Sequence, residues 1–353
     1  MKVVLMGLPG SGKTTIFSAL TGMNIDPSSY SGKSGEPPRA VVKVPDERLQ
    51  TLSAMYRPRK TTPAVVEMVD VTRGLEEEGS GLWSPSELVQ MRMADALCVV
   101  LRNFPDPLGA EADPVKDLSQ IEEEMILSDS ILVENRLDRI AAAKKRGQKS
   151  QDIAAEERFL SEFRDHLLEG KPLRSSETPP TGDLRGFGFL TQKPLMVLVN
   201  SSEDSFGKNP GLLSRLNERY PSEECAGLFE RDLATMEDEE DRQMFMDDLN
   251  ISVSAKDRAV RLIFETVGYI SFFTVGPDEV RAWNLRRGLT AKDAAGTIHS
   301  DLARGFIRAE CFRYEDLVEL GSERSIREKG KFRLEGKDYI VQDGDILSIR
   351  FSV

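Results

Sequence analysis

A complete phosphate-loop motif near the start of the chain constrains the fold more than any other feature of the sequence. Residues 7–14 read Gly-Leu-Pro-Gly-Ser-Gly-Lys-Thr, which matches G-x-x-x-x-G-K-[ST]. The motif follows the apolar run 3–6 and precedes the helical segment 15–20, as a strand–loop–helix unit requires. Its glycines let backbone N–H groups curl around a polyanion, and the helix N-terminus adds the positive end of its dipole. The motif predicts an α/β nucleotide-binding domain, and its completeness disfavours the alternative of an ordinary glycine turn.

Two residues of the motif and one further carboxylate predict a site for Mg²⁺ and a triphosphate. Lys13 is expected to reach the β- and γ-phosphates, and the Thr14 hydroxyl is expected to ligate Mg²⁺. Asp70 closes the apolar run 65–69, where a Walker-B-like acid holds the metal through water. Because an aspartate at a strand end is often only a turn former, this assignment depends on the phosphate loop.

A polar loop after the apolar run 195–199 bears on which base is bound. It reads Asn200-Ser201-Ser202-Glu203, where GTPases of this fold place N-K-x-D. The short Asp of that motif accepts both donors on the edge of guanine, and adenine offers no such pair. Here the acid is one methylene longer and Ser replaces Lys, so the loop favours ATP, with GTP as the alternative. A polar loop without a binding role is the other interpretation.

Apolar runs and helical spacing predict how the chain is organised. Short apolar runs suit parallel strands that are covered on both faces; they lie at 3–6, 64–69, 96–101 and 195–199. The charged stretch 117–170 has apolar residues at helical spacing and a basic, glycine-containing break at 144–149, which predicts an inserted helical hairpin. Residues 173–188 lack periodicity and are expected to form the return loop.

The C-terminal part differs from the rest in its pattern. The acidic stretch 236–249 is expected to be an exposed helix. Beyond it, apolar and polar residues alternate in short segments between glycine turns, at 270–275, 306–312, 339–341 and 346–351. These segments predict a separate small β-rich domain.

Charge and cysteine content exclude several classes of protein. The 353 residues carry a formal charge of -12, which disfavours a protein that coats nucleic acid, although the local cluster 144–149 could contact RNA. Three separated cysteines form neither a disulfide framework nor a zinc pattern. No apolar run approaches the length of a membrane span, and the N-terminus leaves no room for a signal peptide. We expect a cytoplasmic monomer without membrane contact.

The C-terminal motifs resemble the TGS domain of the Obg-like ATPase (YchF) family of TRAFAC-class P-loop proteins. The matching segments are 270–277, 279–283, 294–296, 298–301, 305–310 and 343–345, with 44–49 and Leu8-Pro9 fitting as well. The resemblance implies a P-loop NTPase domain with an inserted antiparallel helical hairpin and a C-terminal β-grasp (TGS) domain. The expected divisions are 1–116 and 190–268 for the P-loop domain, 117–189 for the hairpin and return loop, and 269–353 for the TGS-like domain.

The resemblance also implies an activity and a set of binding residues. The family binds and slowly hydrolyses ATP and associates with ribosomes. Carried over by match, Lys13 is the catalytic residue. The phosphate residues are Pro9, Gly10, Ser11, Gly12, Lys13, Thr14 and Thr15, and the base residues are Asn200, Ser201, Glu203, Ala226 and Gly227.

Departures from the family pattern fall on the switch segments. The D-x-x-G motif appears as Asp70-Val71-Thr72-Arg73, where Arg73 replaces the glycine whose amide senses the γ-phosphate. The nearest equivalent of the metal-binding switch threonine is Ser34, so the predicted metal set is Thr14, Ser34 and Asp70. The family's histidine after Phe104 is missing. Hydrolysis is therefore a weaker prediction than binding.

Three functional hypotheses follow. The first is a Mg²⁺-dependent ATP-binding switch with slow hydrolysis that engages the ribosome or ribosomal RNA. The second is a nucleotide-responsive binding module that has lost hydrolysis, which Arg73 and the missing histidine motivate. The third is a small-molecule kinase, which lacks a recognisable arginine-rich lid and acceptor pocket in this sequence.

Overall fold

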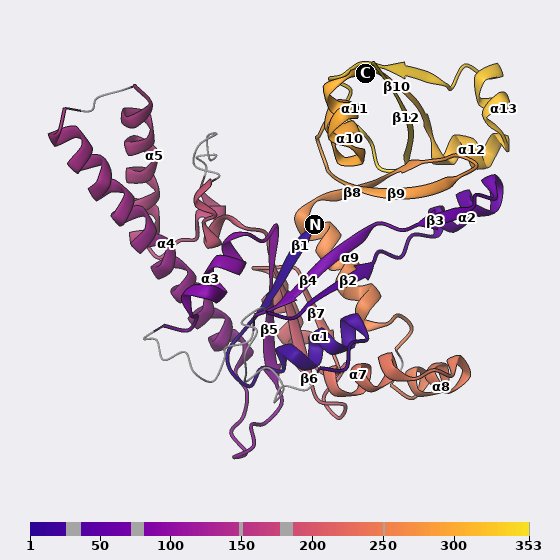
Figure 1. The fold of residues 1–353 in the computed structure, drawn as a ribbon. Helices are drawn as coiled ribbons and strands as arrows, with labels where there is room; N and C mark the ends of the chain where they lie inside the picture. The colour runs from indigo at the N-terminus through magenta and orange to yellow at the C-terminus, as the bar shows by residue number, and fades with distance from the viewer. Residues whose placement is uncertain (26–36, 72–80, 148–150, 177–185, 250, 353) are drawn as a thin grey trace. The chain divides into compact units, whose positions relative to one another are not determined.

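The structure is a computed structural model that describes residues 1–25, 37–71, 81–147, 151–176, 186–249 and 251–352 (Figure 1). Its contacts divide the chain into two compact units. The larger unit consists of Lys2–Ala40 and Glu67–Leu262, and the smaller unit consists of Met1, Val41–Val66 and Ile263–Val353. The four-part division at residues 116, 189 and 268 stays a prediction, but the structure adds that segment 41–66 packs with the C-terminal residues.

A six-stranded sheet in the order β2-β4-β1-β5-β6-β7 forms the first layer of the fold. The strands are β1 (Lys2–Met6), β2 (Arg39–Lys43), β4 (Val65–Asp70), β5 (Ala96–Asn103), β6 (Leu195–Ser201) and β7 (Ser222–Cys225). Every pairing from β4 through β1, β5 and β6 to β7 is parallel. The predicted α/β fold with its four apolar strands is confirmed, because a parallel sheet covered by helices buries both faces of each strand.

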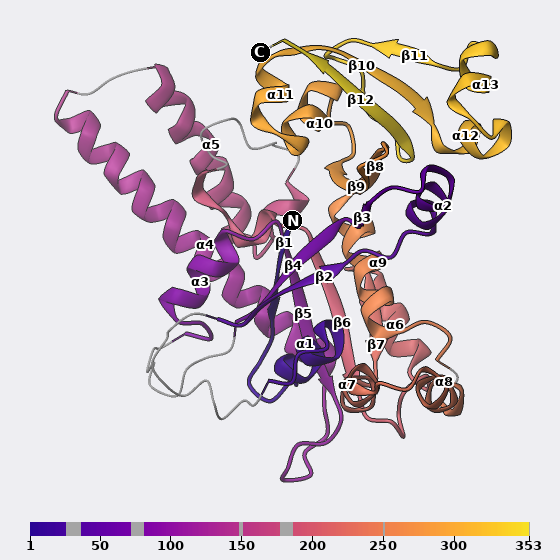
Figure 2. The same ribbon diagram turned by 45° about the vertical axis from the view of Figure 1, so that its right-hand side comes forward.

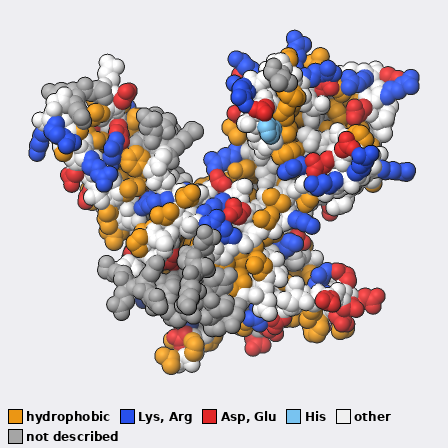
Figure 3. All heavy atoms as spheres, viewed as in Figure 1, with side chains coloured by type: hydrophobic (Ala, Val, Ile, Leu, Met, Phe, Trp, Pro, Cys, Tyr) orange, Lys and Arg blue, Asp and Glu red, His pale blue; other side chains and the backbone are white. Residues whose placement is uncertain are grey.

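Helices follow the strands of this sheet along the chain. They are α1 (Lys13–Thr21), α3 (Pro85–Arg92), α6 (Pro210–Asn217), α7 (Gly227–Thr235), α8 (Glu239–Asp248) and α9 (Ala255–Val267). Helix α8 has no buried residue, and acidic side chains gather over it in the space-filling view (Figure 3). The predicted exposed acidic helix is therefore confirmed.

The predicted helical hairpin is formed by two antiparallel helices, α4 (Pro114–Lys145) and α5 (Gln151–Leu168), as Figures 1 and 2 show. Its own apolar core includes Val133, Ile140, Leu160, Phe163 and Leu167. The hairpin starts with Asp113, whose side chain accepts from the N–H of Lys116, and Pro114 occupies the first turn. Local capping and helical spacing thus explain why the sequence predicted this element.

The base of the hairpin is fixed by a buried carboxylate. Asp129 of α4 is fully buried and accepts hydrogen bonds from the backbone N–H of Leu190 at 3.1 Å and of Thr191 at 2.8 Å. Arg92, at the end of α3, donates to the same carboxylate at 3.1 Å and to the Ser128 hydroxyl at 2.9 Å. One side chain therefore joins α4, α3 and the return segment of the hairpin.

The smaller unit contains a second sheet in the order β11-β10-β12-β8-β9-β3. Its strands are β3 (Lys60–Thr62), β8 (Tyr269–Thr274), β9 (Glu279–Arg286), β10 (Phe306–Arg313), β11 (Arg333–Glu335) and β12 (Asp345–Phe351). The helices α2 (Glu47–Tyr56), α10 (Ala291–Ile298), α11 (Ser300–Arg304), α12 (Tyr314–Leu320) and α13 (Glu323–Glu328) accompany it. The predicted C-terminal β-grasp domain is confirmed.

Two details of this unit differ from the sequence prediction. Residues 339–341 were expected to form a strand, but they contribute only an isolated bridge between Ile340 and Thr290. The reason is Asp345, whose buried carboxylate accepts from the Tyr339 hydroxyl at 2.8 Å and the Gln342 N–H at 2.9 Å and so folds the segment back. In addition, β3 pairs in parallel with β9, which the sequence did not indicate.

The helices of the described ranges are too short or too polar to span a bilayer.

Replacing Asp129 with alanine is expected to lower the free energy of unfolding by about 3 kcal/mol, because Arg92 and two backbone N–H groups lose their buried acceptor. Urea denaturation followed by circular dichroism measures the change. The control is Glu134→Ala, an exposed position on the same helix, which should change stability by less than about 0.5 kcal/mol. Equal effects of the two substitutions would contradict the assignment of Asp129 as the anchor of the hairpin.

Candidate functional site

The phosphate loop connects the buried end of β1 with the start of α1. Gly10 and Gly12 adopt φ angles of 77° and 82°, in the left-handed region that side chains with a Cβ avoid. The turn is closed by a hydrogen bond of 3.2 Å from the Ser11 N–H to the Leu8 carbonyl. Gly12 is the N-cap of α1, so the loop ends at the positive end of a helix dipole. The backbone is thus already shaped to receive an anion.

Close packing also requires glycine at two positions of the loop. A Cβ on Gly7 would lie 2.4 Å from the Val100 carbonyl oxygen of β5. A Cβ on Gly12 would lie 2.1 Å from the Nδ2 atom of Asn200. The loop is therefore held against the neighbouring strands β5 and β6 at distances that exclude a larger residue.

Lys13 lies across its own loop. Its ammonium group donates to the carbonyl oxygens of Gly7 at 2.9 Å and Leu8 at 3.0 Å. Burial lowers the pKa of Lys13 from its ordinary value, and the negative charges of Asp70 and Glu87 oppose that shift. A desolvated cation next to a ring of backbone amides is suited to a polyanion, because the charge is poorly compensated by neutral carbonyl groups alone.

Thr14 and Asp70, two of the three predicted metal ligands, are hydrogen-bonded to each other. The Thr14 hydroxyl donates to Oδ2 of the fully buried Asp70 at 2.9 Å. The parallel register that pairs Leu5 with Asp70 brings the end of β4 beside the phosphate loop. A hydroxyl and a carboxylate are oxygen ligands of the kind that Mg²⁺ takes together with phosphate oxygens and waters. Ser34, the third predicted ligand, lies outside the described residues, as do Thr72 and Arg73.

A metal cage built from protein side chains alone is a different kind of site. Within the described ranges, no three or more His, Cys, Asp or Glu side chains come together in a way that could hold an ion.

Asn200 joins the phosphate loop to a second loop. Its Nδ2 donates to the Ser11 carbonyl at 3.0 Å, and its Oδ1 accepts from the Gly227 N–H at 3.2 Å. Gly227 has no room for a side chain, because a Cβ there would lie 2.4 Å from the Asn200 Oδ1. The structure therefore brings together three of the predicted positions, namely Gly12, Asn200 and Gly227.

The other predicted base residues lie in different environments. The Ser201 hydroxyl is buried, donates to Glu224 at 2.6 Å and accepts from Asn103 at 2.8 Å, so it points into the protein. Glu203 is exposed in the turn that follows β6. Ala226 is buried, and its N–H donates to Glu230 at 3.3 Å.

Pro9 and Gly10 are exposed at the tip of the phosphate loop, and Thr15 is half-buried in the first turn of α1. The phosphate residues of the motif thus form one continuous segment, part of which faces solvent.

Two buried acidic residues near the site were not found by sequence reasoning. Glu230 accepts from the N–H groups of Ala226 and Ala255 and from Arg258 at 2.8 Å. Burial raises the pKa of Glu230, against the opposing effect of Arg258 and the backbone donors. Glu87, whose charge acts on Lys13, is buried by the capping box that starts α3. Glu230 stands in no recognisable motif, so only the fold could reveal it, whereas the S-x-x-E capping-box pattern at 84–87 could have indicated Glu87.

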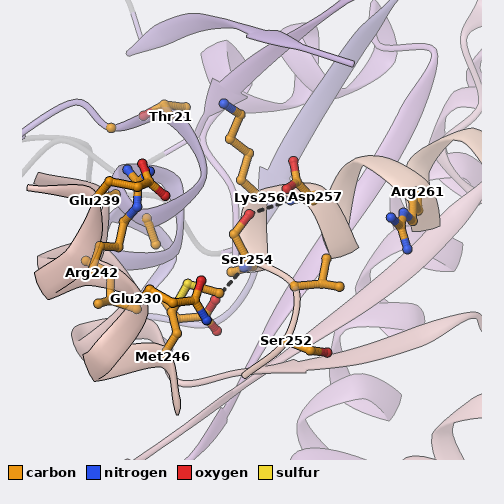
Figure 4. A pocket seen from close by; sticks show the side chains of 17 residues that line it. Thr21, Glu230, Glu239, Arg242, Met246, Ser252, Ser254, Lys256, Asp257 and Arg261 are labelled. Atoms are coloured by element: carbon orange, nitrogen blue, oxygen red, sulfur yellow. Dashed lines mark hydrogen bonds and ion pairs between the residues drawn. The ribbon is translucent and has the colours of Figure 1, made fainter. Parts of the chain in front are cut away.

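A separate cavity of about 600 Å³ lies at the far end of α1, beside Thr21 and Gly22 (Figure 4). It is also lined by charged side chains of both signs, namely Glu230, Glu239, Arg242, Lys256, Asp257 and Arg261. Because the phosphate loop precedes α1 and the cavity lies where α1 ends, the cavity is not part of the phosphate site.

The sheet order, the glycine loop and the paired Thr14 and Asp70 define the chain as a protein of the P-loop NTPase fold. Comparison with known proteins gives the family. The YchF-GTPase_C family model, described as "Protein of unknown function (DUF933)", matches residues 269–352. "Ribosome-binding ATPase YchF" of Bacillus subtilis is 36% identical over 99% of this chain and 98% of its own length.

A plant relative and a solved structure support the same family. "Obg-like ATPase 1" of Oryza sativa subsp. japonica is 36% identical over 100% of this chain and 92% of its own length. The solved structure titled "Structure of the Schizosaccharomyces pombe YchF GTPase" superposes with a TM-score of 0.83 at 29% identity, covering 99% of this chain and 97% of that one. The chain belongs to the YchF, or Obg-like ATPase, family, as its C-terminal motifs predicted.

The two strained glycines of the loop give a matched pair of substitutions. Both Gly10→Ala and Gly12→Ala place a Cβ at positive φ, at a cost of about 1–2 kcal/mol. A Cβ on Gly10 would have open space around it, whereas a Cβ on Gly12 would lie 2.1 Å from Nδ2 of Asn200, so Gly12→Ala should destabilise the protein by about 2 kcal/mol more. Urea denaturation measures both. Equal losses would show that Asn200 does not lie against the loop.

Proposed function

We propose that the protein binds Mg²⁺ and ATP at the phosphate loop, hydrolyses ATP slowly, and acts at the ribosome. The observation that carries the proposal is the preformed loop, with Lys13 lying across it and the Thr14 hydroxyl bonded to Asp70 at 2.9 Å. Relatives from Bacillus subtilis and Haemophilus ducreyi bear the name "Ribosome-binding ATPase YchF", which supports the ribosomal part.

Each residue of the site receives a role in the proposal. Lys13 neutralises charge on the β- and γ-phosphates, and Thr14, Ser34 and Asp70 hold Mg²⁺ directly or through water. The loop amides of Pro9 to Thr15, with Pro9 lacking an N–H of its own, surround the phosphates. The base lies against the segment that contains Asn200, Ser201, Glu203, Ala226 and Gly227.

Slow turnover follows from how this site would accelerate phosphoryl transfer. Lys13 and Mg²⁺ supply positioning and charge neutralisation, and neither is a general base. Arg73 stands where the family has a glycine. We therefore expect the protein alone to hydrolyse ATP slowly and a partner to raise that rate. Loss of hydrolysis with retained binding is the alternative that the experiments below separate.

Replacing Lys13 with alanine is expected to lower the rate of ATP hydrolysis about 10²–10³-fold, because a charge-assisted contact to the transferred phosphoryl group disappears. Phosphate release is measured with and without ribosomes. The control is Lys116→Ala, an exposed lysine on α4. Tight ATP binding with no release above background in the unsubstituted protein would instead support a binding module without hydrolysis.

Calorimetric titration with Mg²⁺ tests the choice of base. We expect ATP to bind at least about tenfold more tightly than GTP, because Glu203 is too long to accept both guanine donors in the geometry that an aspartate allows. The solved structure from Schizosaccharomyces pombe is titled a "YchF GTPase", so GTP is the ligand that ATP has to be compared with. Tighter binding of GTP would refute the adenine assignment and leave the phosphate site intact.

Ribosome association is tested by cosedimentation with and without ATP. Recovery of the protein in the ribosomal fraction at 100 mM salt is expected, and its absence in every nucleotide state would refute this part of the proposal. The cytoplasmic location and the monomeric state stay predictions.

A further inference from the structure

Glu224 of β7 is a buried carboxylate with an unusual set of partners. It is 6% exposed. Its Oε1 accepts from the Ser201 hydroxyl at 2.6 Å and from the Asn209 side-chain amide at 2.7 Å. Its Oε2 accepts from the Gly207 N–H at 3.1 Å. All three donors come from one segment, the loop 201–209 between β6 and α6.

All three of these donors are neutral. Among the residues that the structure describes, the Glu224 carboxylate forms no ion pair within 4.0 Å, in contrast to Glu230 with Arg258. A buried charge without a cation has a substantial desolvation cost, which only well-formed hydrogen bonds can offset. The three hydrogen bonds to Glu224 fix Ser201 at the start of the loop and Gly207 and Asn209 near its end.

The loop between these fixed points carries Glu203. It turns tightly, with hydrogen bonds from the N–H of Ser205 at 3.1 Å and of Phe206 at 2.9 Å to the Ser202 carbonyl. Asn209 precedes α6 at the N-cap, yet its side chain does not cap the helix. It donates instead to Glu224 and to the Ser205 carbonyl at 2.7 Å. A good capping residue is thus used to shape the loop.

The same carboxylate connects this loop with the next one. Glu224 is followed after one residue by Ala226 and Gly227, and Arg258 donates to the Glu224 carbonyl at 3.1 Å, which holds this end of β7. Asn200, directly before Ser201, is bonded to both Ser11 and Gly227. A displacement of the loop 201–209 would therefore act mainly on the base segment, because the phosphate loop has its own closing hydrogen bond from Ser11 to Leu8 in addition to its contact with Asn200.

We propose that Glu224 is a positioning residue that fixes the loop 201–209 and thereby sets how much the nucleobase contributes to binding. The inference rests on the proposed function, because it takes the segment around Asn200 and Glu203 as the base site. Glu224 acts through the loop and not by contact with the nucleotide.

The test compares ATP with inorganic tripolyphosphate, which has the phosphates but no base, both titrated calorimetrically with Mg²⁺. Glu224→Ala is expected to weaken ATP binding about tenfold and to change tripolyphosphate binding less than about twofold. Ser201→Ala, which removes one of the three donors, should weaken ATP binding in the same direction by a smaller factor. The control is Glu218→Ala, which removes an exposed carboxylate at the end of α6.

The outcomes separate this inference from the proposed function. A wild-type protein that retains neither ligand refutes the phosphate site itself. A wild-type protein that binds both ligands equally, or a Glu224→Ala variant that loses both equally or neither, overturns the role of Glu224 and leaves the phosphate site standing. Near-ultraviolet circular dichroism reports folding. If Glu224→Ala does not fold, Glu224→Gln and Ser201→Ala decide the question with the same two ligands.

Discussion

The contact between the phosphate loop and Asn200 fixes the position of the loops that form the candidate site in the larger unit. Gly12 lies so close to the Asn200 amide that a methyl group would not fit between them, and the Ser11 carbonyl accepts from the same amide at 3.0 Å. Through its other atom, Asn200 binds the Gly227 N–H at 3.2 Å. Three loops that follow β1, β6 and β7 are thereby fixed relative to one another, which is what a preformed anion site needs.

Buried carboxylates fix other segments of the chain in a similar way. Asp129 holds the hairpin to α3 and the return segment, Glu224 holds the loop 201–209, and Glu230 joins residues 226 and 255. Asp345 does the same in the smaller unit. In each case a carboxylate accepts at least one backbone N–H group of a turn, a loop or the start of a helix. Such groups need an acceptor when buried, and one carboxylate can serve two or three of them.

Packing also explains which segments of the chain make up each unit. The hairpin has its own core around Phe163, so it can extend from the larger unit as a long element. The smaller unit incorporates residues 41–66, and β3 extends its sheet beside β9. The chain therefore passes from the larger unit into the smaller one at residue 41 and returns at residue 67, within the strand that carries Asp70.

Local patterns in the sequence determined the phosphate loop, the four apolar strands, the hairpin and the family, because glycine spacing and apolar periodicity reflect backbone conformation and burial directly. They also selected Asn200 and Gly227, although only by resemblance. They did not reveal Glu224 or Glu230, since a glutamate that is buried by distant segments has the same local sequence as an exposed one. The strand expected at 339–341 is reduced to a single bridge, and Asp345 accepts hydrogen bonds from Tyr339 and Gln342 only a few residues earlier in the chain. What only the tertiary structure decided is which polar side chains are buried and which loops they hold, since those contacts join residues far apart in the chain.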